Sequence, residues 1–119
     1  MRTPFLSITA LIVLLAGCMP PQTPFYWGDY SVSLYNYKKT PDDKTFAEHK
    51  QSLIVIITES PNKPLPVPPG IYAEYGYMLI LEGKEQEGLE YMDKEVTLYP
   101  ESRIFVERLK RAFKKGDES

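Results

Sequence analysis

The sequence contains few of the side chains on which most enzymes and metal sites depend. Among its 119 residues there is one cysteine, Cys18, and one histidine, His49. A lone cysteine cannot close an internal disulfide, and one cysteine with one histidine cannot build a zinc cluster. No glycine-rich loop of the kind that cradles phosphate is present. We therefore expect no metal site, no cofactor and no catalytic residues.

Neither positive nor negative charge predominates in the sequence. The chain has 14 Lys and Arg against 16 Asp and Glu, a formal net charge of −2. This balance gives no electrostatic reason to expect nucleic acid as a partner. A Ser-His-acid set could be drawn from His49 and one of several serines, but no serine stands in a nucleophile-type turn. His49 falls on an apolar stripe, which favours a packed, hydrogen-bonded histidine.

No apolar run is long enough to cross a membrane, which takes ~20 residues. The longest runs from Phe5 to Ala16, follows a basic start at Arg2, and ends in the segment Leu15-Ala16-Gly17-Cys18. This layout is typical of a bacterial lipoprotein signal. We predict cleavage of residues 1–17 and attachment of lipid to the Cys18 thiol. The alternative is an ordinary secretory signal followed by a buried cysteine.

A lipid on Cys18 would anchor the protein to a membrane without spanning it. Each buried methylene contributes ~0.8 kcal/mol, so two or more acyl chains are needed for stable anchoring. Resemblance to bacterial lipoproteins implies three chains, palmitate among them. Residue 19 is Met rather than the Asp that signals inner-membrane retention. We expect the outer membrane of a Gram-negative bacterium, facing the periplasm, with residues 18–25 as a proline-stiffened lipidated tether.

Residues 26–115 are predicted to form one all-α domain of about five antiparallel helices. Residues 60–70 hold five prolines and are expected to be a connector, although a proline-rich ligand for another domain is the alternative. A polar, disordered tail is expected at 116–119. The predicted helices span residues 26–39, 41–59, 69–82, 84–98 and 101–114.

Local signals support these helices. Thr40 is the expected N-cap of the second helix, with Pro41 at its first position. The β-branched run 53–57 could form a strand, but helical spacing from Phe46 onward favours helix. Gly83 suits the end of the third helix. The expected apolar stripes are Phe46, His49, Leu53 and Ile56 or Ile57, then Leu89, Met92, Val96 and Tyr99, then Phe105, Leu109, Ala112 and Phe113.

Aromatic side chains are the main candidates for a binding surface, because Tyr and Trp are enriched at interaction hot spots. Their helical spacing also fits a face that packs in the core, and the core is favoured because a domain this small has few other large side chains to bury. The candidate partner-binding residues are Trp27, Tyr30, Tyr72, Tyr75 and Tyr77.

Pro69 to Pro100 resembles a tetratricopeptide repeat, a helix-turn-helix unit that stacks into right-handed arrays. Tyr72 takes the early aromatic position, Gly76 the site of close helix approach, and Gly83 the turn. The second helix has Gly88 at a small-residue position, Met92 at a large apolar one, and Glu95 where a small residue is usual. The resemblance implies a tetratricopeptide-like stack with a concave binding surface.

The mature chain also resembles a family of small Gram-negative lipoproteins catalogued only as a domain of unknown function. The segments that carry this resemblance are residues 26–30, 34–35, 67–77 and 99–102. Members are often encoded beside a lipoprotein similar to the curli secretion pore. The resemblance implies a role in an envelope assembly, with such a lipoprotein as partner, and it supplies no catalytic residues.

These observations favour a lipid-anchored, non-enzymatic scaffold or adaptor in the assembly of an outer-membrane complex. One alternative is a periplasmic lipoprotein that binds a small ligand in an aromatic-lined pocket. A less favoured alternative is a cell-wall-active enzyme, or an enzyme's cofactor, that uses the carboxylates of Glu74, Glu82 and Glu85. The sequence does not indicate an oligomeric state.

Overall fold

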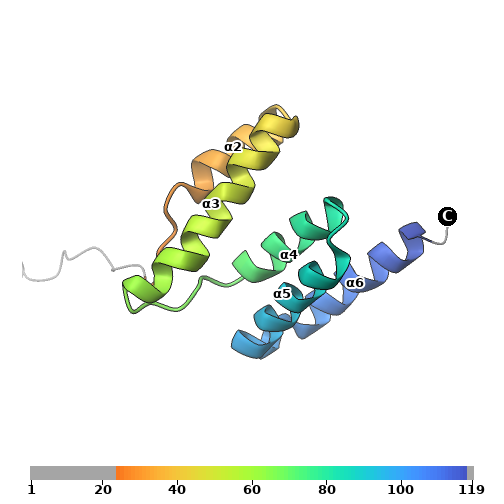
Figure 1. Ribbon diagram of the computed structural model, residues 1–119. Helices are drawn as coiled ribbons and strands as arrows, with labels where there is room; N and C mark the ends of the chain where they lie inside the picture. Colours follow the sequence, from red (N-terminus) through yellow and green to blue (C-terminus); the bar gives the residue numbers. More distant parts are fainter. Residues whose placement is uncertain (1–23, 118–119) are drawn as a thin grey trace, which may run out of the picture.

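A computed structural model describes residues 24–117, and this part of the chain is helical without strands. The predicted all-α class is confirmed. Each helix packs mainly against its neighbours in the chain, so that the α2–α3 pair lies at one end and α6 lies beyond α5 at the other (Figure 1). The predicted signal peptide, Cys18 and most of the tether lie outside the described residues. The elements are α2 (Tyr30–Lys39), α3 (Asp43–Asn62), α4 (Ile71–Leu81), α5 (Glu85–Leu98), the 3-10 turn η1 (Pro100–Ser102) and α6 (Arg103–Asp117).

The first helix begins later than predicted, at Tyr30 instead of residue 26. Gly28 has φ +46°, in the left-handed region that interrupts a helix. The Tyr30 amide donates to the Trp27 carbonyl at 3.0 Å and closes a turn ahead of the helix. Trp27 therefore belongs to this turn and not to the helical face.

The N-cap of α3 is Asp42, and the prediction of Thr40 is wrong. The Asp42 carboxylate accepts from the Thr45 amide at 2.8 Å, and the Thr45 hydroxyl accepts from the Asp42 amide at 3.1 Å. This reciprocal capping box satisfies two backbone donors at once, which a cap at Thr40 would not do. It also places Pro41 before the helix instead of at its first position.

The run 53–57 is helical, as predicted, but α3 continues to Asn62 and includes Pro61. The connector therefore begins at Lys63 and not at residue 60. A proline so close to the end removes one helical hydrogen bond, and the residues on either side of it keep theirs. The Ser60 hydroxyl donates to the Ile56 carbonyl at 2.6 Å, and the Lys63 amide donates to the Glu59 carbonyl at 3.2 Å.

The helices α4 and α5 form a tight hairpin around Gly83, as predicted. Gly83 has φ +83°, its amide donates to the Ile80 carbonyl, and the Lys84 amide donates to the Leu79 carbonyl, both at 2.9 Å. This pair of bonds is the Schellman motif, which satisfies the last carbonyls of α4. The turn sends α5 back along α4.

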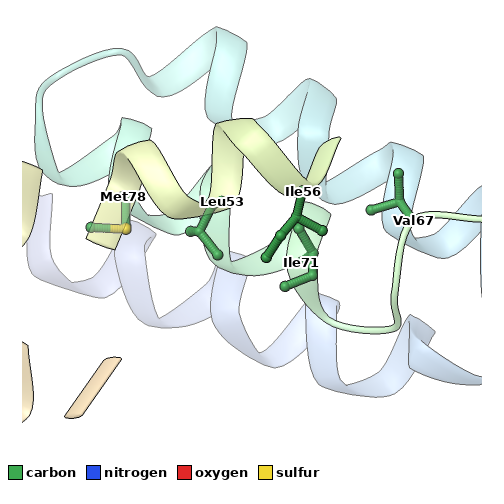
Figure 2. Close-up of a cluster of buried hydrophobic side chains, with 5 residues drawn as sticks. All are labelled: Leu53, Ile56, Val67, Ile71 and Met78. Atoms are coloured by element: carbon green, nitrogen blue, oxygen red, sulfur yellow. The ribbon is translucent and has the colours of Figure 1, made fainter. Parts of the chain in front are cut away.

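The core has two parts that meet at α4. Between α3 and α4, Leu53 and Ile56 face Ile71 and Met78, and Val67 from the connector closes one end (Figure 2). On the other side of α4, Ala73 packs with Met92 of α5 and Val106 of α6. Because α4 is covered on both sides, it is apolar around most of its circumference.

The last helix differs from the prediction in its buried face and in its end. Phe105 was expected in the apolar stripe, but it is 56% exposed, whereas Val106 is 1% exposed. The face of α6 that packs on the core consists of Val106, Leu109 and Phe113, which are at helical spacing. Phe105 therefore points away from the core. The helix runs to Asp117, two residues into the range predicted to be a tail.

Among residues 24–117, no helix is long and apolar enough to span a bilayer.

Candidate functional site

An apolar groove lies between α4 and α6, with a volume of about 340 Å³. Tyr77 and Phe105 line it from opposite helices, 38% and 56% exposed. The Tyr77 ring also packs 5.3 Å from the Phe113 ring, which fixes its position. The groove thus offers two accessible aromatic side chains on rigid helices. Its lining is completed by Gly70, Ala73, Glu74 and Leu109.

At the edge of this groove, Glu74 belongs to a polar network that joins three helices. The His49 Nε2 atom of α3 lies 2.7 Å from Glu74 Oε1 of α4, and the Tyr30 hydroxyl of α2 donates to Glu74 Oε2 at 2.8 Å. His49 Nδ1 lies 2.8 Å from the Ser33 Oγ of α2. Since a carboxylate only accepts, Nε2 carries the proton of the bond to Glu74. Each ring nitrogen of His49 therefore has a partner.

The environment of this network changes the acidity of Tyr30. Burial and the adjacent Glu74 carboxylate raise the pKa of the Tyr30 hydroxyl above its usual value. The hydroxyl therefore remains a donor to Glu74 at physiological pH.

The Ser33-His49-Glu74 set contains the residue types of a hydrolase triad, but its arrangement differs. Ser33 is 9% exposed and lies inside α2, and its single hydroxyl proton is shared between His49 Nδ1 and the Tyr30 carbonyl oxygen, 3.1 Å away. In a hydrolase, the serine faces substrate beside backbone donors that stabilise an oxyanion. The amides around Ser33 are instead used by the helix: its own donates to the Asp29 carbonyl. The network's evident role is to fasten α2 and α3 to α4.

Glu95 is a buried carboxylate, and backbone amides of a neighbouring helix satisfy it. Glu95 is 1% exposed in α5, and its Oε1 accepts from the Gly70 amide at 2.7 Å. Its Oε2 accepts from the Ala73 amide at 3.4 Å, a longer bond. These amides belong to the first turn of α4, where backbone donors lack helical partners and the helix dipole favours an anion. Glu95 thus caps α4 from a neighbouring helix.

The structure separates the five candidate partner-binding residues into two groups. Four of them, Trp27, Tyr30, Tyr72 and Tyr75, are partly buried against the core between α3 and α4. Burial also raises the pKa of the Tyr72 and Tyr75 hydroxyls. Only Tyr77 is exposed, and it lines the groove.

The acidic residues near the α4–α5 turn do not converge. Glu82 binds Lys50 of α3 at 2.5 Å, while Glu85 and Glu87 are exposed in the first turn of α5. In the described part of the chain, no three His, Cys, Asp or Glu side chains are grouped so that they could hold a metal ion.

Comparison with known families identifies a family for this chain. The family model described as "Domain of unknown function (DUF4810)" matches residues 25–109. The chain belongs to this DUF4810 family. The match includes every residue that lines the groove and every member of the Tyr30–Ser33–His49–Glu74 network. No curated protein and no solved structure shows significant similarity to the chain.

Sequence reasoning identified Tyr77 but missed Phe105 as an exposed groove residue, and it missed the roles of Ser33, Glu74 and Glu95. Glu74 lies 25 residues from His49 in the chain, and Glu95 lies 25 residues from Gly70. Such long-range bonds have no local spacing signal. One signal was available for Glu95. It occupies a position that packs against another helix in the repeat pattern, and a carboxylate buried there must have hydrogen-bond partners.

Proposed function

We propose that this DUF4810 protein is a lipid-anchored, non-enzymatic adaptor of the Gram-negative envelope that binds a partner protein in an outer-membrane assembly. The observation that carries the binding role is the groove between α4 and α6, with Tyr77 and Phe105 accessible on rigid helices. Aromatic anchors in an apolar recess are the usual centre of a protein interface.

The likeness to tetratricopeptide repeats supports the same role. The pairing of α4 with α5 around Gly83, and the position of α6 across the groove from α4, fit a tetratricopeptide-like stack whose first helices line a concave surface. In that interpretation Glu95 replaces a small residue in order to cap α4. The partner implied by the family resemblance is a curli-secretion-type lipoprotein.

The Leu15-Ala16-Gly17-Cys18 segment supports the proposed lipid anchor. The mass of the native protein tests it. Intact-mass spectrometry of the native product should give a chain that starts at Cys18 and carries acyl groups. Cys18→Ser should leave the protein unacylated and released from the membrane fraction. A native chain that retains residues 1–17, or that starts with an unmodified residue, would contradict the anchor.

The binding role is tested by a groove variant with a matched control. Phe105→Asp places a charge in the groove at a position that is 56% exposed, so the fold should tolerate it. Leu98→Asp, at a position 42% exposed outside the groove lining, introduces the same charge elsewhere. Co-purification of the curli-secretion-type lipoprotein from detergent-solubilised envelopes should be lost only with Phe105→Asp. Equal recovery with both variants would contradict the groove as the binding surface.

Binding of a small ligand is a second candidate function. The groove volume of about 340 Å³ lies at the lower end of the range for ligand pockets. A thermal-shift screen separates the two, since a ligand at a hundred times its Kd adds ~2.7 kcal/mol to stability. A hit whose shift disappears in Phe105→Asp would favour the ligand over the protein partner.

A further inference from the structure

The two outer helices expose apolar side chains, and the hollows beside them are lined by charges of opposite sign. At one end, α2 exposes Val32 and Tyr35, each 62% exposed. At the other end, α6 exposes Ile104 at 64%. In stacks whose helices contact mainly their neighbours, the terminal helices need a polar outer face unless another chain covers them. The charged residues on each face indicate what could cover it.

The first face is a hollow of about 490 Å³ between α2 and α3, which we call the acidic face. Its charged lining residues, within the described chain, are Asp29 and Glu48, and both are acidic. Glu48 has only a loose, exposed ion pair with Lys44, at 3.8 Å, which contributes little. Val32 and Val55 supply the apolar part, and the buried Ser52 Oγ in this lining has no hydrogen-bond partner among residues 24–117.

The opposite face, here the basic face, is a shallow hollow on α6 lined by Arg108, Arg111, Ala112 and Lys115. Ile104, Arg108 and Arg111 follow one another at helical spacing and form one exposed stripe. The helix dipole accounts for cations only in the last turn. Because α6 runs to Asp117, Arg108 and Arg111 lie before that turn, and the dipole does not account for them.

We propose that the acidic face of one copy binds the basic face of a second copy, so that the protein associates head to tail. The carboxylates of Asp29 and Glu48 would meet the guanidinium groups of Arg108 and Arg111, while Val32 would pack near Ile104. Arginine suits this role because its planar group binds carboxylates bidentately. The interface joins two different surfaces and leaves one of each unoccupied in a dimer, so further copies can add. It is separate from the α4–α6 groove and does not depend on the adaptor role.

Charge reversal tests this proposal on the full-length chain in detergent, with native mass spectrometry as the readout. The wild type should form dimers and larger species that increase with concentration and decrease with salt. The head variant Asp29→Lys with Glu48→Lys should be monomeric alone. The tail variant Arg108→Glu with Arg111→Glu should also be monomeric alone.

Recombination of the variants gives the decisive results. Mixing the head and tail variants should give dimers and larger species in which the two variants alternate in equal amounts, because each retains or acquires the complement of the other. A chain with all four reversals should associate again. Glu90→Lys with Glu101→Lys is the matched control, since both side chains are exposed and neither lines either face. It should associate as the wild type does.

Circular dichroism of every variant checks that the helices are retained. A wild type that stays monomeric at all concentrations would overturn the proposal. Head and tail variants that associate as strongly as the wild type would overturn it as well, because the interface would then lie elsewhere.

Discussion

Gly76 of α4 and Gly88 of α5 touch backbone to backbone. A Cβ atom on Gly76 would stand 2.5 Å from the Gly88 carbonyl oxygen, and one on Gly88 would stand 2.5 Å from the Gly76 carbonyl oxygen. No side chain fits between the two helices at this point. The contact sets the spacing of α4 and α5, and α6 packs against that pair. The groove therefore depends on two residues that do not line it.

Gly76→Ala and Gly88→Ala should each destabilise the protein by about 2 kcal/mol or more, because overpacking typically costs ~1–3 kcal/mol and the contact here is with backbone. Urea denaturation followed by circular dichroism measures the change. Gly116→Ala is the matched control, since in the described part of the chain its added Cβ meets no atom within 4 Å beyond its chain neighbours and its own helix backbone, and the position is helical. It should be neutral or slightly stabilising. Alanine tolerated equally at all three positions would contradict the close contact.

Glu95 belongs to α5, but removal of its carboxylate should destabilise α4. Glu95→Ala leaves the Gly70 and Ala73 amides without their acceptor, which typically costs ~1–3 kcal/mol per buried polar group. Glu95→Gln keeps one acceptor oxygen and should lose less. Urea midpoints measure both, with hydrogen exchange at the first turn of α4 as a local readout. Glu90→Ala, on the exposed side of the same helix, should stay within about 0.5 kcal/mol of the wild type.

The bond between Tyr30 and Glu74 should appear as coupling between α2 and α4. In a double-mutant cycle of Tyr30→Phe and Glu74→Gln, the two losses of stability should not add, with an interaction term of ~0.5–3 kcal/mol. A parallel cycle of Tyr35→Phe with Glu74→Gln is the control, since Tyr35 is exposed. Additive behaviour in both cycles would show that the hydrogen bond does not hold α2 in place.

Alkaline pH should destabilise the protein through its partly buried tyrosines. Burial raises the pKa of Tyr30, Tyr72, Tyr75 and Tyr99 above the ordinary value of 10.0. A raised pKa means that the unfolded chain releases these protons first, so their stabilising contribution is complete below pH 10 and is lost as pH rises further. Urea midpoints should fall above about pH 10.

Tyr30→Phe should make that decline shallower, because it removes one of the contributing hydroxyls. Tyr35→Phe, at a position 62% exposed, controls for the loss of a hydroxyl as such. A slope unchanged by Tyr30→Phe would contradict the assigned environment of Tyr30.

Local chemistry allowed much of the fold to be predicted. The alternation of apolar stripes with glycine and proline located every helix and the turn at Gly83. The close approach at Gly76 was expected only from the resemblance to a tetratricopeptide repeat. Errors at the helix ends arose where two signals competed: Asp42 with its partner Thr45 displaced Thr40, and Gly28 made the first helix begin later than its aromatic spacing suggested.

The candidate site was less predictable because its members are distant in sequence. His49 was correctly expected to be packed and hydrogen-bonded, but its partners Ser33 and Glu74 come from other helices. Phe105 shows the complementary error. Helical spacing alone cannot distinguish a buried aromatic from its neighbour Val106 when the direction of the next packing surface is unknown.

The most direct test of the adaptor role is photocrosslinking in living cells of the native host. A photoreactive amino acid in place of Phe105 should give one discrete adduct with another envelope protein. The same residue in place of Gln86, exposed on α5 outside the groove lining, should give none. Absence of an adduct at position 105, or equal adducts at both positions, would contradict the groove as the docking surface.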